Sequence, residues 1–218
     1  PYPISNTLIY LDPARRSQSG GKVFRIEDCE PNVIALLPAL RKYASHIMIK
    51  FSPMLDITAA LRALGTDWDT HIVAVNNEVK EVLILTGMGL MHAVNICATH
   101  TDTICFTEQE EKLAAVHMAT SIATYLYEPN ASIMKAGCFA ELERAFGAKQ
   151  VERNSHLFVS EHFIEDFPGR KFRVEKVTTL NKKDIKNALD GIVKANITVR
   201  NFPMSVEQLR KRLKIKEG

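Results

Sequence analysis

The sequence predicts an α/β fold, in which an open sheet with helical crossovers is followed by a smaller α+β unit. In the first 65 residues, apolar runs alternate twice with amphipathic segments, as in parallel strands joined by helices. After residue 124 the pattern changes to a β-α-β-β-α-β order. The charge changes there too, because residues 1–124 hold 10 Lys and Arg against 13 Asp and Glu (−3), and the rest holds 18 against 12 (+6). A basic half indicates a polyanion-binding module, although ordinary solvated charge explains the difference equally well.

The first half contains the signals of the sheet. Residues 6–11 are an apolar strand that ends on Asp12 and Pro13, and a helix is expected from Pro31, with Asp28 as its cap. A second strand is expected at 46–50 and a second helix from Leu55 to Gly65. Further expected elements are a strand at 71–75, a helix at 78–83, strands at 92–97 and 103–107, and a helical connector at 108–123.

The second half predicts the ferredoxin-like split motif. Its expected elements are a strand at 125–129, a helix at 131–146, strands at 157–159 and 171–174, a helix at 184–193 and a strand at 197–199. A last helix is expected at 206–213. We place the boundary inside the connector, which gives domains of residues 1–112 and 113–218.

The composition indicates a folded protein without a membrane span or a metal. Hydrophobic residues make up 46% of 218, and no apolar run approaches the roughly 18 residues of a spanning helix. The start lacks both an initiator methionine and a signal pattern, so we expect a cytoplasmic protein and a chain cut from a longer one. The four cysteines form no C-x-x-C pair and are expected to be reduced and mostly buried. No metal is expected, because His92, Cys97 and His100 fit no standard ligand spacing.

Several blocks of residues resemble one bacterial family, the class I S-adenosylmethionine (SAM)-dependent methyltransferases that carry a C-terminal THUMP-like, ferredoxin-like domain. Residues 12–16, 28–31, 50–57 and 77–81 resemble the methyltransferase domain. Residues 125–131, 135–137 and 199–203 resemble the THUMP-like domain. The resemblance implies the C-terminal part of a Rossmann-like methyltransferase sheet followed by an α+β domain, with SAM as the cofactor.

The same resemblance shows which motif this sequence lacks. Family members carry a glycine-rich turn and a following acid that hold SAM, and no glycine cluster precedes Asp12 here. Family members also continue past the position of Gly218 with another strand. We therefore expect an internal-to-C-terminal piece of an enzyme, inactive alone, with the main cofactor-binding motif outside it.

The candidate catalytic segment is Asp12, Pro13, Ala14 and Arg15. Ligands of open α/β sheets bind outside the carboxyl ends of the strands, where this segment is expected to lie. The resemblance implies that Asp12 and the Pro13-Ala14 backbone accept hydrogen bonds from a target amine and align it with the methyl group. Arg15 stands where such enzymes often have an aromatic residue, and it can stack on a base or grip a phosphate. The alternative is an ordinary capped turn with solvated arginines.

The candidate substrate-binding residues follow the first two strands and should line the same crevice. Lys50 could pair with Asp12 or Asp56, or contact a phosphate, and Asp56 could equally cap its helix. Cys29 is expected to be structural rather than the nucleophile that pyrimidine carbon methylation needs. The full set is Arg16, Lys50, Ser52, Pro53 and Asp56.

The candidate RNA-binding residues belong to the basic second half, with Phe172 among them. Phosphate contacts require only such charges, and an aromatic ring adds contact with a base. Tyr125, Tyr127 and Phe202 are expected in the core or in an interface. The RNA-binding set is Arg170, Lys171, Arg173, Lys182 and Lys183.

The expected function is methylation of an RNA, such as tRNA or rRNA, with SAM. Two other classes stay open. One is a non-catalytic RNA-binding or interaction protein with a vestigial methyltransferase fold. The other is a methyltransferase of DNA or of a small molecule, which differs only in what the basic half binds.

Overall fold

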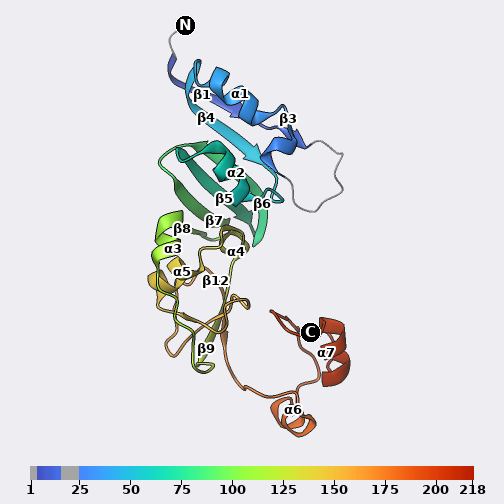
Figure 1. The fold of residues 1–218 in the computed structure, drawn as a ribbon. Helices are drawn as coiled ribbons and strands as arrows, with labels where there is room; N and C mark the ends of the chain where they lie inside the picture. The colour runs from blue at the N-terminus through green and yellow to red at the C-terminus, as the bar shows by residue number, and fades with distance from the viewer. Residues whose placement is uncertain (1–3, 16–24) are drawn as a thin grey trace. The chain divides into compact units, whose positions relative to one another are not determined.

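The computed structural model describes residues 4–15 and 25–218 (Figure 1). The chain forms two compact units, which we call the first unit (Pro1–Ala114 and Asn130–Glu141) and the second unit (Ala115–Pro129 and Leu142–Gly218). Within the described ranges, no helix is long and apolar enough to cross a membrane.

The first unit is built on a six-stranded mixed sheet in the order β1-β4-β6-β5-β7-β8. Parallel neighbours are β1 (Ile4–Leu11) with β4 (Ala44–Phe51), and β5 (Trp68–Val75) with β7 (Leu90–Ile96). The strands β6 (Glu78–Thr86) and β8 (Thr101–Thr107) run antiparallel to their neighbours. The predicted α/β class is confirmed, with a mixed sheet rather than a purely parallel one.

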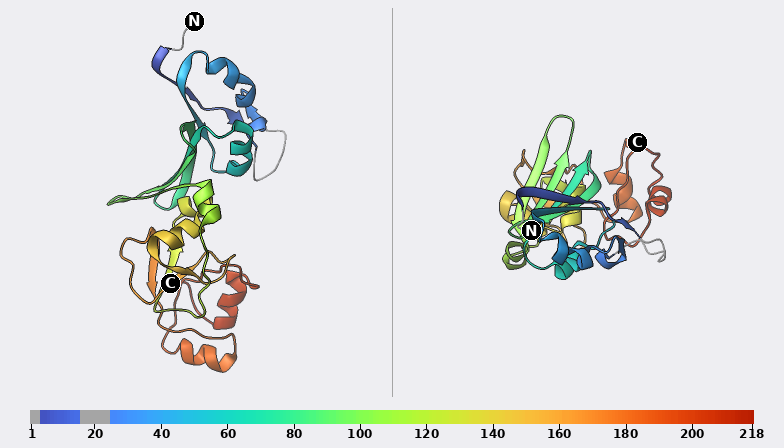
Figure 2. Two further views of the ribbon diagram at one scale, coloured as in Figure 1. Left: turned by 60° about the vertical axis from the view of Figure 1, so that its left-hand side comes forward. Right: turned by 90° about the horizontal axis from the view of Figure 1, so that it is seen from above.

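Helices follow the first two long strands and lie on one side of this sheet (Figure 2). They are α1 (Val33–Leu40) and α2 (Ile57–Leu64). Alternate residues of β4, β5 and β7 are buried, as expected when one face of a sheet is covered. The smaller elements are β2 (Ala14–Arg15), the 3-10 helix η1 (Ile26–Asp28), β3 (Cys29–Glu30), α3 (Glu108–Leu113) and α4 (Ala131–Ala136).

The first helix begins later than predicted. Its cap is Asn32, whose side chain accepts a hydrogen bond from the backbone N–H of Ala35 at 3.1 Å. Asp28, the predicted cap, lies in η1 instead, and Pro31 follows a cis peptide bond before the helix. The cap prediction was wrong because Asn32, also a good capping residue, stands nearer to the helix.

The predicted helix at 78–83 is wrong, because these residues form the start of β6. The β5–β6 register shifts between Val73 and Ala74, which leaves Lys80 as one extra residue in β6. The bulge places Val79 and Val82 on the same face of the sheet, three positions apart. This spacing imitates the period of a helix.

Two long helices, predicted at 108–123 and 131–146, are interrupted. The connector is helical only to Leu113, because the backbone N–H of His117 donates to Glu143 (2.9 Å) and that of Ala119 donates to Gln150 (2.7 Å). The predicted helix at 131–146 is two helices, since Gly137 ends α4 with a φ of 74°.

The second unit contains an antiparallel sheet in the order β10-β11-β9-β12. Its strands are β9 (Tyr125–Pro129), β10 (Lys149–Gln150), β11 (Phe158–Ser160) and β12 (Gly169–Arg173). The helices of this half of the chain are α5 (Phe139–Phe146), α6 (Lys182–Ala188) and α7 (Val206–Leu213). Residues 197–199 form no strand, contrary to prediction.

Candidate functional site

The carboxyl ends of β1 and β4 bring two predicted site residues together. Leu11 lies opposite Ile49 in the parallel ladder, so Asp12 and Lys50 follow at the same edge of the sheet. The Nζ atom of Lys50 lies 2.7 Å from Oδ2 of Asp12, and the two side chains are 28% and 51% exposed. The hydrogen bond with Asp12 raises the pKa of Lys50, which keeps the lysine charged. This ion pair is one of the contacts that the sequence left open.

The segment after Asp12 is tied to the chain before α1. Ala14 pairs with Glu30, and the backbone of Arg15 pairs with that of Cys29, in the antiparallel β2–β3 ladder. This pairing limits how far the backbone after Asp12 can move. Arg16 and the side chain of Arg15 lie outside what the structure describes.

Cys29 is buried beside this segment, with 1% of its surface exposed. Burial raises the pKa of its thiol to about 11, and the charges of Asp28 and Glu27 add to the effect. The thiol is therefore protonated at neutral pH and is a poor nucleophile. The environment of Cys29 favours the structural interpretation over covalent catalysis.

Local hydrogen bonds hold the loop after β4. The carbonyl of Ser52 accepts from the N–H of Leu55 at 3.1 Å, across the turn that contains Pro53. The Oδ1 atom of Asp56 accepts from the N–H of Ala59 at 2.9 Å and caps α2. The geometry of Asp56 therefore supports its interpretation as a helix cap. The loop places Ser52 and Pro53 just beyond Lys50.

The same loop is held by Lys135 of α4, to which the sequence assigned no role. The Nζ atom of Lys135 donates to the carbonyl of Leu55 at 2.9 Å, across 80 positions of sequence. Burial lowers the pKa of Lys135, and the charge of Asp56 acts in the opposite direction. Lys135 therefore ties α4 to the loop that starts α2.

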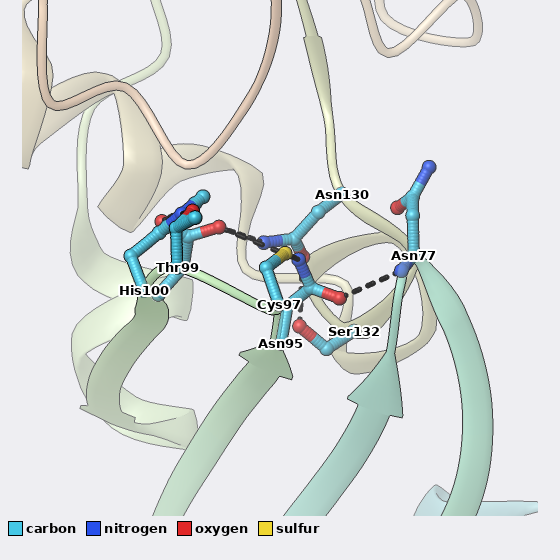
Figure 3. A network of polar contacts seen from close by, with 8 residues as sticks. Asn77, Asn95, Cys97, Thr99, His100, Asn130 and Ser132 are labelled. Carbon is cyan, nitrogen blue, oxygen red and sulfur yellow. Dashed lines mark hydrogen bonds and ion pairs between the residues drawn. The ribbon is translucent and has the colours of Figure 1, made fainter.

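The start of α4 is held in turn by two buried amides, Asn95 near the end of β7 and Asn130 at the cap of α4 (Figure 3). Asn95 accepts from the N–H of Asn77 at 2.9 Å and donates to Oδ2 of Asp102 at 3.4 Å. Asn130 donates to the same oxygen at 3.4 Å and accepts from the hydroxyl of Ser132 at 2.7 Å. Asn95 and Asn130 are both only 3% exposed. These bonds join the start of α4 to the sheet edge.

The predicted RNA-binding residues of β12 do not share one face. Arg170 lies opposite Glu128 of β9, and Phe172 points to the same face as Arg170. Lys171 and Arg173 point to the other face, since side chains alternate along a strand. The β12 part of the predicted set is therefore divided between two surfaces.

Glu128 joins two arginines in the second unit. Its side chain is 7% exposed, and its two carboxylate oxygens accept from Arg170 and Arg200. Arg170 is thus held by a structural partner, although 56% of its side chain is exposed. Lys182 and Lys183 lie in the first turn of α6 and form no ion pair within the described part of the chain.

Cysteines and metal ligands complete the survey of reactive groups. All four cysteines are free, with Cys29 and Cys138 buried. Cys97 is half-buried and Cys105 exposed, so the expectation of mostly buried thiols holds for only two of them. Among residues 4–15 and 25–218, no group of three His, Cys, Asp or Glu side chains is arranged to hold a metal ion.

Comparison with known proteins gives family matches for the second half of the chain and one similar solved structure for nearly all of it. Residues 125–168 match a ferredoxin-like domain family, and residues 169–218 match a family described as THUMP domain-like. A crystal structure of a candidate methyltransferase from Porphyromonas gingivalis is 34% identical, with a TM-score of 0.86. The match covers 97% of this chain and 54% of that one, so the chain spans about half of its neighbour's length. No curated protein matches the sequence. Over nearly its whole length the chain therefore resembles the C-terminal portion of that candidate methyltransferase, and residues 125–218 match the ferredoxin-like and THUMP-like family models.

Proposed function

We propose that the protein is a SAM-dependent methyltransferase that acts on an amino group of a structured RNA. The observation that carries the proposal is the Asp12–Lys50 pair at the ends of two adjacent parallel strands. The similarity to a candidate methyltransferase supports the reaction class. The Asp-Pro segment at the end of β1 suits an amine substrate.

Asp12 has one carboxylate oxygen to offer the substrate. Lys50 contacts Oδ2, and Oδ1 has no partner within the described residues. A target N–H can donate to Oδ1, which turns the nitrogen lone pair toward the methyl donor. Such alignment supplies a large part of the rate enhancement when two reactants are held in contact. The buried, protonated thiol of Cys29 supports an amine acceptor over a route through a cysteine adduct.

SAM would supply the methyl group when bound. The carboxylate of Asp12 fits the acceptor side of the reaction. The sequence has no glycine-rich turn before Asp12, so we assign no residue of this chain to the ribose or the methionine moiety. The four free cysteines suit a reducing compartment such as the cytoplasm.

The second unit supports RNA as the substrate class. Residues 169–218, which match the THUMP-like family, hold 14 Lys and Arg against 5 Asp and Glu, a net charge of +9. Lysine and arginine contacts to phosphates supply most of the sequence-independent affinity for nucleic acids. A basic unit of this kind can hold an RNA while the first unit acts on it.

The test is transfer of a labelled methyl group from SAM to total RNA by the full-length protein. Asp12→Ala should lower the rate about 100-fold, because the amine loses its orienting acceptor. Lys50→Met should lower it less, since Asp12 remains but is no longer fixed. Asp67→Ala, an exposed carboxylate away from the β1 and β4 ends, is the matched control and should keep wild-type activity.

Other outcomes distinguish the rival functions. RNA binding without methyl transfer to any RNA would favour the non-catalytic class. Transfer to DNA or to a small molecule, but not to RNA, would keep the enzyme and discard its proposed substrate. Full activity of Asp12→Ala would remove the assigned role of the Asp-Pro segment.

A further inference from the structure

The second unit contains a pocket of about 550 Å³ that the proposed methylation does not use. Its floor includes Leu126 and Glu128 of β9 and Phe172 of β12, and its walls come from α6, α7 and residues 196–202. Pockets that bind small organic ligands measure about 300–1,000 Å³. This pocket is therefore large enough for one nucleotide.

Two phenylalanine rings line the pocket and remain exposed. Phe172 and Phe202 are each 44% exposed, whereas Tyr127 and Phe158 of the same unit are fully buried. Phe202 was expected in the core or in an interface, and its exposure rules out the core. Exposed aromatic rings in a concave surface are suited to stacking on unpaired bases, because every base presents a flat face.

Glu128 orients two arginine side chains at the pocket. It binds one N–H group of Arg170 and one of Arg200, so each guanidinium keeps other donors. Arg200 lines the pocket, and the guanidinium of Arg170 lies 5.8 Å from the ring centre of Phe172. A guanidinium held in one orientation can stack on a base or donate to its oxygen and nitrogen atoms. The buried carboxylate thus prepares two cations for a planar ligand.

The lining of the pocket is mostly aliphatic, and the charge that could meet a phosphate comes from Arg200 and from residues beside the pocket. Ile185 of α6 lines the pocket, and Lys182 lies three positions earlier on the same helix. Positions three apart on a helix share a face, so Lys182 belongs to the side of α6 that carries Ile185, although it does not itself line the pocket. Asn196 and Thr198 add polar groups to the lining.

We infer that this pocket holds one unpaired nucleotide of the RNA, with its base against Phe172 and Phe202 and its phosphate toward the α6 lysines. The inference rests on the proposed function, since it needs an RNA substrate. It adds that the second unit recognises an unpaired nucleotide and does not only attract the charge of a duplex.

The test compares two labelled RNA hairpins, one with a blunt end and one with a four-nucleotide single-stranded extension, by fluorescence anisotropy with the full-length protein. Wild type should bind the extended hairpin more tightly. Phe202→Ala and Phe172→Ala should weaken binding of the extended hairpin about 5- to 100-fold and leave the blunt hairpin unchanged, because stacking on one base is lost. Phe202→Trp should retain the preference, which separates stacking from misfolding.

Phe163→Ala is the matched control, because Phe163 is an exposed phenylalanine (55%) of the second unit that does not line the pocket. It should bind both hairpins like wild type. Equal affinity of wild type for the two hairpins would overturn the inference, as would pocket variants that behave like Phe163→Ala. Displacement of the extended hairpin by micromolar AMP or GMP would also overturn it, because the pocket would then serve free nucleotides. If neither hairpin binds, RNA fails as the substrate class, whereas binding of both with no effect of the pocket variants refutes only the inference.

Discussion

The two units place their ion pairs in opposite environments. Asp12 and Lys50 of the first unit form an exposed pair at a sheet edge, where water screens their attraction. Glu128 of the second unit is buried and holds two arginines, and an unpaired buried carboxylate would be costly. An exposed pair such as Asp12–Lys50 can exchange partners easily, whereas burial holds the Glu128 cluster in one arrangement.

Removing Glu128 should give the largest loss of stability. Glu128→Ala leaves two guanidiniums beside each other without their carboxylate, and we expect a loss of roughly 2 to 3 kcal/mol, less than for a fully buried pair because both arginines are partly exposed. Urea unfolding followed by far-UV circular dichroism measures it. Trp68, the single tryptophan, lies in the first unit, so its fluorescence transition should not move. Glu165→Ala, which removes an exposed acid of the same unit, is the control, and an equal loss in that variant would contradict the role of Glu128.

The amide network of the first unit should matter somewhat less. Asn130→Ala removes the cap of α4 and one donor to Asp102, for an expected loss of about 1.5 kcal/mol. Here the Trp68 fluorescence transition should shift to lower urea. A shift of the circular dichroism transition alone would mean that Asn130 stabilises the second unit, not the first. Asn154→Ala, at an exposed position of the second unit, should leave the Trp68 transition in place.

Charge removal from α6 should affect RNA affinity rather than stability. Lys182→Gln with Lys183→Gln should weaken RNA binding about tenfold and lower the slope of log affinity against log salt by between 1 and 2, because two phosphate contacts are lost. Lys42→Gln with Lys112→Gln removes the same charge from the first unit and should leave the slope unchanged. A similar change in both double variants would mean that the second unit has no special part in RNA binding.

Elements with a clear local sequence pattern were the most predictable. The helix at 206–213 is observed at those positions, and the meeting of Asp12 with Lys50 follows from two apolar strands that each end on a charged residue. The helix predicted at 78–83 failed because a bulge hid the strand alternation. The missed signal was Asn76-Asn77, where φ values of 49° and 64° make a two-residue hairpin turn.

Contacts between segments that are distant in sequence could not be predicted from the sequence. Arg200 meets Glu128 across 72 positions from a segment without regular structure, so no periodicity indicates the pair. Lys135 and Leu55 are 80 positions apart, and their bond depends on where α4 lies on the sheet. Local patterns predict elements, whereas these contacts depend on tertiary placement.

The smallest expected effect is a pH dependence of the stability of the first unit. The rings of His71 and His92 stack with centroids 4.2 Å apart and an interplanar angle of 6°. Burial lowers the pKa of His71 and the charge of His92 adds to this, so the folded state binds the proton less readily than the unfolded state. The stability from neutral His71 is fully present above the unfolded pKa, about 6.5, and is lost as pH falls below it.

The Trp68 transition should therefore occur at lower urea at pH 5.5 than at pH 7.5, and His71→Gln should reduce this difference. His156 of the second unit provides the matched control, because burial lowers its pKa too, with Arg200 adding to the effect. His156→Gln should leave the pH response of the Trp68 transition intact, since that histidine titrates in the other unit. If both variants reduced the response equally, the two units would unfold as one, and the proposed site of the first unit would not differ in stability from the Glu128 cluster of the second.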